Sequence, residues 1–202
     1  MRNAYEIVDA FERRVAEFAG AQYAVAVDSC TNGLFLSLKW LARDLTHPMP
    51  TIVVPARTYC SVPMAVRQAG FGVAFNDYAW IGAYTLSPTC VVDGAKRFRR
   101  GMYMGGYHCL SFHIKKSINI GRGGMILHDD HKFDSWARSV RHNGRSVVDP
   151  ANRSPVRIGY DCYMTPDQAA RGLMLMDVMP PDGFPDQTEA YPDLRGQRDL
   201  FL

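Results

Sequence analysis

The apolar residues of this chain change repeatedly between the spacing of a helix and that of a strand. The first apolar residues, from Ile7 to Phe18, lie on one face of a helix, and Gly20 follows as a stop signal. Further helices are predicted at residues 31–43, 61–69 and 132–142. Short strands are predicted at residues 23–27, 51–54, 72–76, 89–92, 107–111 and 124–128. This alternation predicts an α/β fold with a mostly parallel sheet and helices on both faces.

Size and composition indicate one main domain. With 202 residues, of which 47% are apolar, the chain can bury one good core. We expect a domain at residues 1–179 and a proline-rich tail at 180–202 that is extended or disordered. The five cysteines form no pair of zinc-site spacing, so no metal is predicted. Because no apolar stretch is long enough to cross a bilayer, we expect a soluble cytoplasmic protein without a membrane partner.

Polar residues that could bind a ligand or take part in catalysis follow the predicted strands, each at the point where a strand ends. They are Ser29 and Thr31, Arg57 and Tyr59, Asp93, and the run from Ser111 to Lys116. Ligands bind at this edge of open α/β sheets, so groups far apart in the sequence are expected to meet at one site.

Taken singly, these residues have simpler explanations. Ser29 or Thr31, just before a predicted helix, could bind an anion at the helix N-terminus or could be an ordinary N-cap. Asp93 could pair with a cationic ring nitrogen, or it could be a turn residue. Tyr59 could stack on a ligand, or it could pack in the core. Their occurrence together is stronger evidence for a ligand site than any one of them alone.

The turn that begins at Ser111-Phe112 indicates what kind of site these residues could form together. A lysine, Lys116, follows it, and then Gly121-x-Gly123-Gly124. This turn resembles the lysine signature of the DegT/DnrJ/EryC1/StrS sugar aminotransferase family. In that family the lysine holds pyridoxal 5'-phosphate (PLP) as a Schiff base. The resemblance assigns this role to Lys116 and not to its neighbour Lys115, which could instead supply a positive charge that lowers the pKa of Lys116.

The resemblance also implies roles for other residues. Ser29, Cys30 and Thr31 match the family's Ser-Gly-Thr segment, which binds phosphate, and Asp93 matches the aspartate that keeps the pyridine nitrogen protonated. Tyr59 matches the aromatic residue that stacks on the cofactor. Further cofactor contacts are expected from Ser111, from Lys96 in the place of a Gln or His, and from Asp161 in the place of an Asn that reaches across the dimer.

Membership of this family would imply a particular architecture and reaction. Such proteins have PLP-dependent fold type I and are generally homodimers. Most transfer an amino group from glutamate to a keto sugar linked to a nucleotide. The family's smaller C-terminal domain is expected to be largely missing after about Met176. The small-molecule partners would then be an amino acid donor and a keto sugar acceptor.

Other functions remain open at this point. Lys96, Arg122, Asp161 and Tyr163 depart from the family pattern. With the missing domain, they suggest a truncated, catalytically impaired relative that acts as a PLP-binding or regulatory partner. The run 96–100 could form a nucleic-acid patch, but one short basic run is usually a solvated loop, so we expect no nucleic-acid partner.

Overall fold

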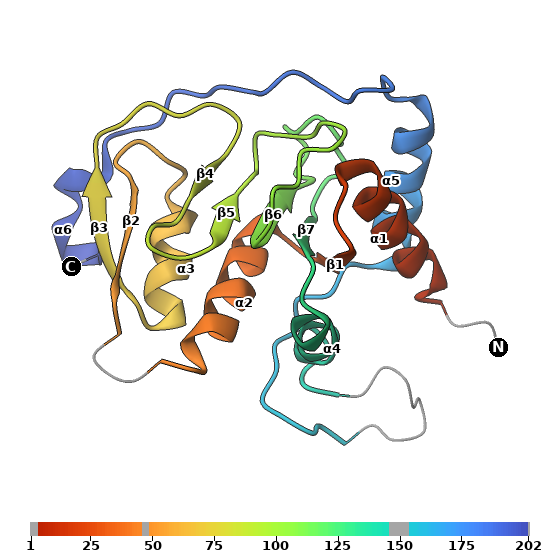
Figure 1. The fold of residues 1–202 in the computed structure, drawn as a ribbon, viewed down its shortest axis with the longest axis horizontal. Coiled ribbons are helices and arrows are strands. Elements are labelled where there is room, and N and C mark those ends of the chain that lie inside the picture. Colours follow the sequence, from red (N-terminus) through yellow and green to blue (C-terminus); the bar gives the residue numbers. More distant parts are fainter. Residues whose placement is uncertain (1–3, 46–48, 146–153, 202) are drawn as a thin grey trace.

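The computed structural model describes residues 4–45, 49–145 and 154–201. A five-stranded sheet forms its centre, and a pair of strands continues the sheet beside it (Figure 1). The order of the large sheet is β1 (Tyr23–Val27), β7 (Gly124–His128), β6 (Tyr107–Ser111), β5 (Val91–Asp93) and β4 (Tyr84–Thr85). The pair consists of β2 (Thr51–Pro55) and β3 (Gly72–Asn76). An isolated bridge between Val53 and Ser87 connects the pair to the segment that contains β4.

The sheet is mixed, which corrects the expectation of a mostly parallel one. β7 runs antiparallel to both of its neighbours, and β4 runs antiparallel to β5, whereas β5 with β6 and β2 with β3 are parallel. The loop 112–123 between β6 and β7 contains no helix. Because no crossover helix carries the chain to the other end of the sheet, β7 must run back antiparallel beside β6.

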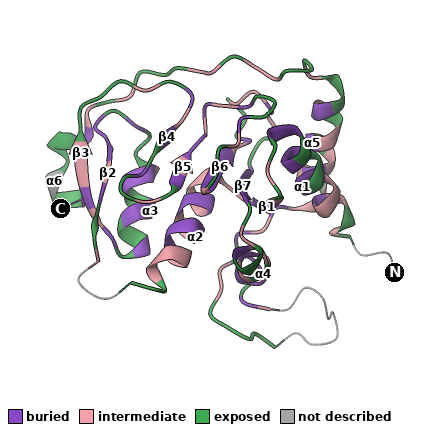
Figure 2. Cartoon of the chain, in the orientation of Figure 1, coloured by how far each residue is buried: buried purple, intermediate pink, exposed green. Residues whose placement is uncertain are grey.

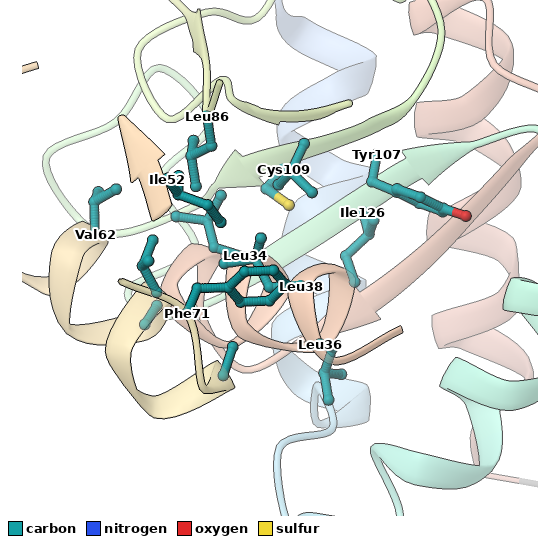
Figure 3. Packing of buried hydrophobic residues seen from close by; sticks show 14 of the residues in the cluster. Leu34, Leu36, Leu38, Ile52, Val62, Phe71, Leu86, Tyr107, Cys109 and Ile126 are labelled. Carbon is teal, nitrogen blue, oxygen red and sulfur yellow. The ribbon is translucent and has the colours of Figure 1, made fainter. Parts of the chain in front are cut away.

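Helices cover both faces of the sheet, as the alternation predicts (Figure 2). One face packs against α1 (Glu6–Ala19) and α5 (Pro166–Val178). The other packs against α2 (Cys30–Ala42), α3 (Ser61–Ala69) and α4 (His131–Val140). Successive residues of β1 point to opposite faces of the sheet. Ala24 and Ala26 lie toward α1, and Val25 and Val27 lie toward α2. Figure 3 shows Leu34 and Leu38 of α2 packed below Cys109 of β6.

Most predicted elements lie where the sequence pattern indicates, with small shifts at their ends. The helix predicted from Thr31 begins at Cys30, and the strand predicted at 89–92 is formed by Val91–Asp93. Before residue 180, two elements were not predicted, the short β4 and the helix α5; the helical turns found after residue 193 were not predicted either. The sequence does carry a signal for α5, because Thr165 and Gln168 form a capping box around Pro166.

The C-terminal residues follow an extended path and then pack on the fold. We call residues 180–193 the C-terminal strap; it runs from the end of α5 along the edge of the molecule towards β3 (Figure 1). A 3₁₀ turn (Leu194–Gly196) and α6 (Arg198–Phe201) follow it. Leu194 and Phe201 are buried in the main core, where α6 packs against α3 and the Phe201 ring lies 5.6 Å from that of Phe75 in β3. No helix in the described parts of the chain has the length and apolar character to cross a membrane.

Candidate active site

A cavity of about 530 Å³ lies where β5 and β6 end and α2 begins. Eight of the nine residues that the sequence assigned to a site line it. These residues are Ser29, Cys30, Thr31, Tyr59, Asp93, Lys96, Ser111 and Lys116. The ninth, Asp161, lies outside the cavity; it is exposed and forms a bridge with His142. The structure therefore brings most of the predicted set together at the expected sheet edge.

The glycines of the lysine turn allow a close approach between the turn and α2. Gly121 has a φ of 95°, and its carbonyl accepts a hydrogen bond from Ile114 N at 3.0 Å. A Cβ atom on Gly124 would lie 2.4 Å from the carbonyl carbon of Ser29. Only a glycine can therefore start β7 here, and the turn is held against the N-terminus of α2.

Lys116 is half-buried within this turn, and its backbone NH donates to His113 O at 2.8 Å. Burial lowers the pKa of Lys116, and the positive charge of Lys96 lowers that pKa further. The expected source of the neighbouring charge, Lys115, is solvent-exposed, and the main neighbouring cation is Lys96 instead.

Asp93 is a buried carboxylate at the end of β5, with 5% of its surface exposed. Its Oδ1 accepts a hydrogen bond from Ala95 N at 3.0 Å, and its Oδ2 accepts one from the Tyr84 hydroxyl at 2.9 Å. Burial raises the pKa of Asp93, while these two donors oppose the increase. Tyr84 was not predicted to contribute. It reaches Asp93 because β4 and β5 pair Tyr84 directly opposite Asp93.

The N-terminus of α2 presents hydroxyl groups and backbone NH groups to the cavity. Ser29 is the N-cap, and its Oγ accepts a hydrogen bond from Asn32 N at 3.2 Å. The hydroxyls of Thr31 and Ser61 are 2.7 Å apart and share a hydrogen. The Cys30 thiol donates to Cys109 O at 3.5 Å, and burial raises the pKa of this thiol. A helix N-terminus with free donors of this kind suits an anion.

Arg122, which departs from the family pattern, lies at the same end of α2. Its guanidinium donates to Asp28 Oδ2 at 2.6 Å. Asp28 also accepts a hydrogen bond from Asn32 Nδ2 at 2.6 Å. The arginine therefore neutralises a carboxylate that would otherwise repel an anion from this helix terminus.

An aromatic wall completes the cavity, and part of it comes from the C-terminal strap. Tyr59 is 57% exposed, and its ring lies 6.3 Å from that of Tyr191. Tyr191 also stacks on Trp80 at 6.1 Å. The strap contributes a carboxylate as well, because Glu189 pairs with the buried ammonium of Lys96. No periodic pattern in the sequence predicts that Tyr191 or Glu189 lies here.

The basic run 96–100 does not form a free patch. Arg97 Nη2 binds Asp186 of the strap at 2.6 Å, and Arg100 Nε donates to Pro181 O at 2.9 Å. Phe98 is buried against α1. These residues hold the strap, so they offer neither the aligned cations nor the exposed ring that a nucleic-acid patch needs.

The fold is shared with solved structures of aminotransferases. A putative PLP-dependent aminotransferase from Bacillus cereus ATCC 10987 superimposes with a TM-score of 0.71 at 20% identity, over 86% of this chain and 59% of the other. Residues 1–91 and 94–180 match the model of the DegT/DnrJ/EryC1/StrS aminotransferase family, and the chain belongs to that family.

Individual relatives are distant. The spore coat polysaccharide biosynthesis protein SpsC of Bacillus subtilis (strain 168) is 24% identical over 182 residues, which cover 69% of this chain and 46% of SpsC. A DegT DnrJ EryC1 StrS aminotransferase from Brucella abortus superimposes with a TM-score of 0.70 at 19% identity, over 85% of this chain and 58% of the other. PseC of Helicobacter pylori, an aminotransferase involved in the biosynthesis of pseudoaminic acid, gives 0.72 at 15% identity, over 86% and 61%. The chain spans about half the length of the curated relative.

Proposed function

We propose that this chain forms the cofactor-binding part of a PLP-dependent aminotransferase that transfers an amino group from an amino acid to a keto sugar. The cavity supports this proposal most directly, because it collects Lys116, Asp93 and the hydroxyls of α2 in one place. In this assignment, Lys116 carries the cofactor and Asp93 faces the pyridine nitrogen. Ser29 and Thr31 receive the phosphate.

The residues present fit PLP in charge and in shape. Four basic and two acidic side chains line the cavity. With Lys116 as the neutral amine, and with Asp28 beside Arg122 included, three cations and three carboxylates remain, so the site has no excess negative charge that would repel a phosphate. The hydroxyls and backbone NH groups at the α2 N-terminus would supply hydrogen bonds to the phosphate dianion. The space between Gly124 and Ser29 is closed by backbone, so the open volume lies on the side of Lys116.

PLP, when bound, supplies a ring that withdraws electrons from the substrate carbon. The protein side chains do the remaining work. Lys116 attacks an aldehyde only as a neutral amine, which its lowered pKa favours. Its Nζ is then the group that removes and returns the substrate proton. Asp93 can stabilise a cationic ring nitrogen while ionised, a state that the donors Tyr84 and Ala95 promote.

The nature of the substrates rests on the relatives. SpsC is named for polysaccharide biosynthesis, and DesI was solved with its TDP-sugar product. A keto sugar linked to a nucleotide, with glutamate as the amino donor, is therefore our proposal for this chain. A homodimer and a cytoplasmic location stay predictions of the same kind.

Two measurements test the proposal. The purified protein is incubated with PLP and reduced with borohydride, and the labelled peptide is mapped. A label on Lys116 is expected, and its absence would refute the assignment. L-Glutamate is then added to unreduced protein, and conversion of PLP to pyridoxamine phosphate is followed by absorbance. A label without conversion would favour the second candidate below.

A second candidate function is a catalytically impaired relative that binds PLP or a protein partner. Its specific support is the strap, because Glu189 and Tyr191 line the cavity and reduce the room for a substrate. Asp161 also stands where the family has an Asn that reaches across the dimer, and a carboxylate there would repel the phosphate. The glutamate reaction separates the two candidates, because a regulatory relative would not convert the cofactor.

A further inference from the structure

The C-terminal strap contributes to the cavity although the family match ends at residue 180. Two of its side chains, Glu189 and Tyr191, line the cavity together with Lys116. These two residues are therefore a property of this chain and not of the matched family segment.

The strap is fixed on both sides of Glu189. Before it, Gln187 N donates to Lys96 O at 2.9 Å, and Asp186 pairs with Arg97 at 2.6 Å. After it, Leu194 N donates to Ala56 O at 2.9 Å, and the Leu194 side chain is buried in the core. The position of Glu189 is thus set by anchors that lie outside the cavity.

Glu189 supplies the counter-ion for an unusual buried cation. Lys96 is only 7% exposed, and its ammonium contacts Glu189 Oε2. The Tyr191 hydroxyl donates to the same oxygen at 2.8 Å, and the Lys96 ammonium lies 5.7 Å from the centre of the Tyr191 ring. A buried ammonium without a partner is strongly unfavourable, so the strap makes a lysine at this position tolerable.

We propose that the strap is a working part of the site, in which Glu189 is a positioning residue that holds Lys96 and sets the net charge acting on the Lys116 amine. The importance of this control rests on the proposed function, because Lys116 is the residue assigned to carry the cofactor. Glu189 and Lys96 are not assigned to touch the reacting atoms.

The charges around Lys116 make the proposal specific in sign. The cation that acts most on Lys116 is Lys96, and the opposing groups are Asp93, Cys30 and Glu189. The other titratable or charged groups on the cavity wall are Tyr59, Tyr191, His113, Lys115 and Arg122, the last paired with Asp28. Lys96 and Glu189 carry opposite charges. Neutralising Lys96 must therefore raise the pKa of Lys116, and neutralising Glu189 must lower it.

The test measures the pKa of Lys116 in the whole chain without PLP. Trace acetylation with acetic anhydride is carried out over a range of pH, and tandem mass spectrometry of the peptides separates Lys116 from its neighbour. Lys96→Gln is expected to raise the pKa of Lys116 by about one pH unit, and Glu189→Gln is expected to lower it by a smaller amount, because Glu189 acts on Lys116 more weakly than Lys96 does. A shift of about one pH unit corresponds to about a tenfold change in the deprotonated fraction at neutral pH.

Asp177→Asn is the matched control, because it removes an exposed carboxylate that pairs with Arg14 outside the cavity and leaves the anchors of the strap in place. It should leave the pKa of Lys116 unchanged. If Glu189→Gln does not fold, Lys96→Gln is compared with the double variant, and loss of the carboxylate must again lower the pKa. Shifts of equal sign in the two single variants, or a full shift in Asp177→Asn, would overturn the proposal. Borohydride labelling of the wild type is scored separately, so opposite shifts without a label would reject the proposed function alone.

Discussion

Tyr84→Phe removes one hydroxyl from a buried network and leaves the ring in place. The hydroxyl donates to Asp93 Oδ2 at 2.9 Å and lies 2.5 Å from Thr58 Oγ1. The ring packs against Trp80 with centroids 4.7 Å apart, and this contact survives in phenylalanine. The substitution therefore tests how far one donor determines the charge state of Asp93.

The magnitude follows from the strength of this hydrogen bond in its two charge states. A hydrogen bond to an ionised group contributes about 1.5–3 kcal/mol, and one between neutral groups contributes about 0.5–1.5 kcal/mol. The difference, about 1 kcal/mol or somewhat more, corresponds to an increase of about one pH unit in the pKa of Asp93.

The sign of the pH dependence follows from the direction of the shift. Burial already raises the pKa of Asp93 above its unfolded value, so its contribution to stability is fully present below the unfolded pKa and is lost as the pH rises through the folded pKa. Removing the donor raises the folded pKa further. The variant should therefore lose most stability at neutral pH, about 1.5–3 kcal/mol, and least when Asp93 is protonated.

The assay combines urea unfolding at several pH values with a ¹³C NMR titration of the aspartate carboxyl groups. Tyr107→Phe is a matched control, because its hydroxyl donates at the same 2.9 Å to Asp130, a less buried carboxylate far from the cavity. The control should leave the titration of Asp93 unchanged. If Tyr84→Phe destabilised the protein equally at all pH values and left the pKa of Asp93 unchanged, the electrostatic reasoning would be wrong.

Three further predictions concern the amine, the glycine turn and a buried charge. Lys116→Ala should abolish the visible absorbance and borohydride label of PLP-treated protein, and Lys115→Ala should retain both. Gly124→Ala should lower the free energy of unfolding by about 1–3 kcal/mol in urea titrations, whereas Gly196→Ala, with open space around it, should change it little. Glu12→Gln breaks buried ion pairs with two arginines at the end of α4, so it should cost about 3–5 kcal/mol at neutral pH, and a calorimetric loss below 1 kcal/mol would contradict this. Because these pairs lower the pKa of the glutamate, its stabilisation is present above the unfolded pKa and is lost as the pH falls through the folded one.

The α/β class could be predicted because each strand carries its own pattern. In β1, alanine and valine alternate between the two sheet faces, and the valines meet α2 while the alanines leave room for α1. The direction of β7 was missed for a different reason. Period-two patterning is the same for parallel and antiparallel strands, and only the absence of a helix between Phe112 and Gly123 indicated that the chain turns back.

The unpredicted elements β4 and α5 differ in the signals that their sequences carry. β4 pairs only Tyr84 and Thr85, which is too short for any periodic signal. α5 had a usable start signal in Thr165-Pro166 but a weak interior, because Gly172 lowers helix propensity. The structure explains that glycine, since a Cβ there would lie 2.4 Å from the ring of Phe11 on α1.

In the candidate site, too, the position of a residue at a strand end could be predicted from its own segment, whereas its contacts with other segments could not. Groups that follow strand ends could be placed at one edge from topology alone, which is why Asp93, Lys116 and Ser29 line one cavity. Their individual roles stay predictions.

The partner of Lys96 could not be identified from the sequence. A lysine just after a buried strand needs a carboxylate partner, so an acidic neighbour could have been inferred from the sequence. Its identity could not, because Glu189 lies far along the chain in a strap with no helical or strand periodicity. The partner is selected by anchors such as Arg97–Asp186 and the buried Leu194, which are tertiary contacts. The charge environment of the proposed reactive amine therefore depends on how the end of the chain packs, and a reading limited to the lysine turn would miss it.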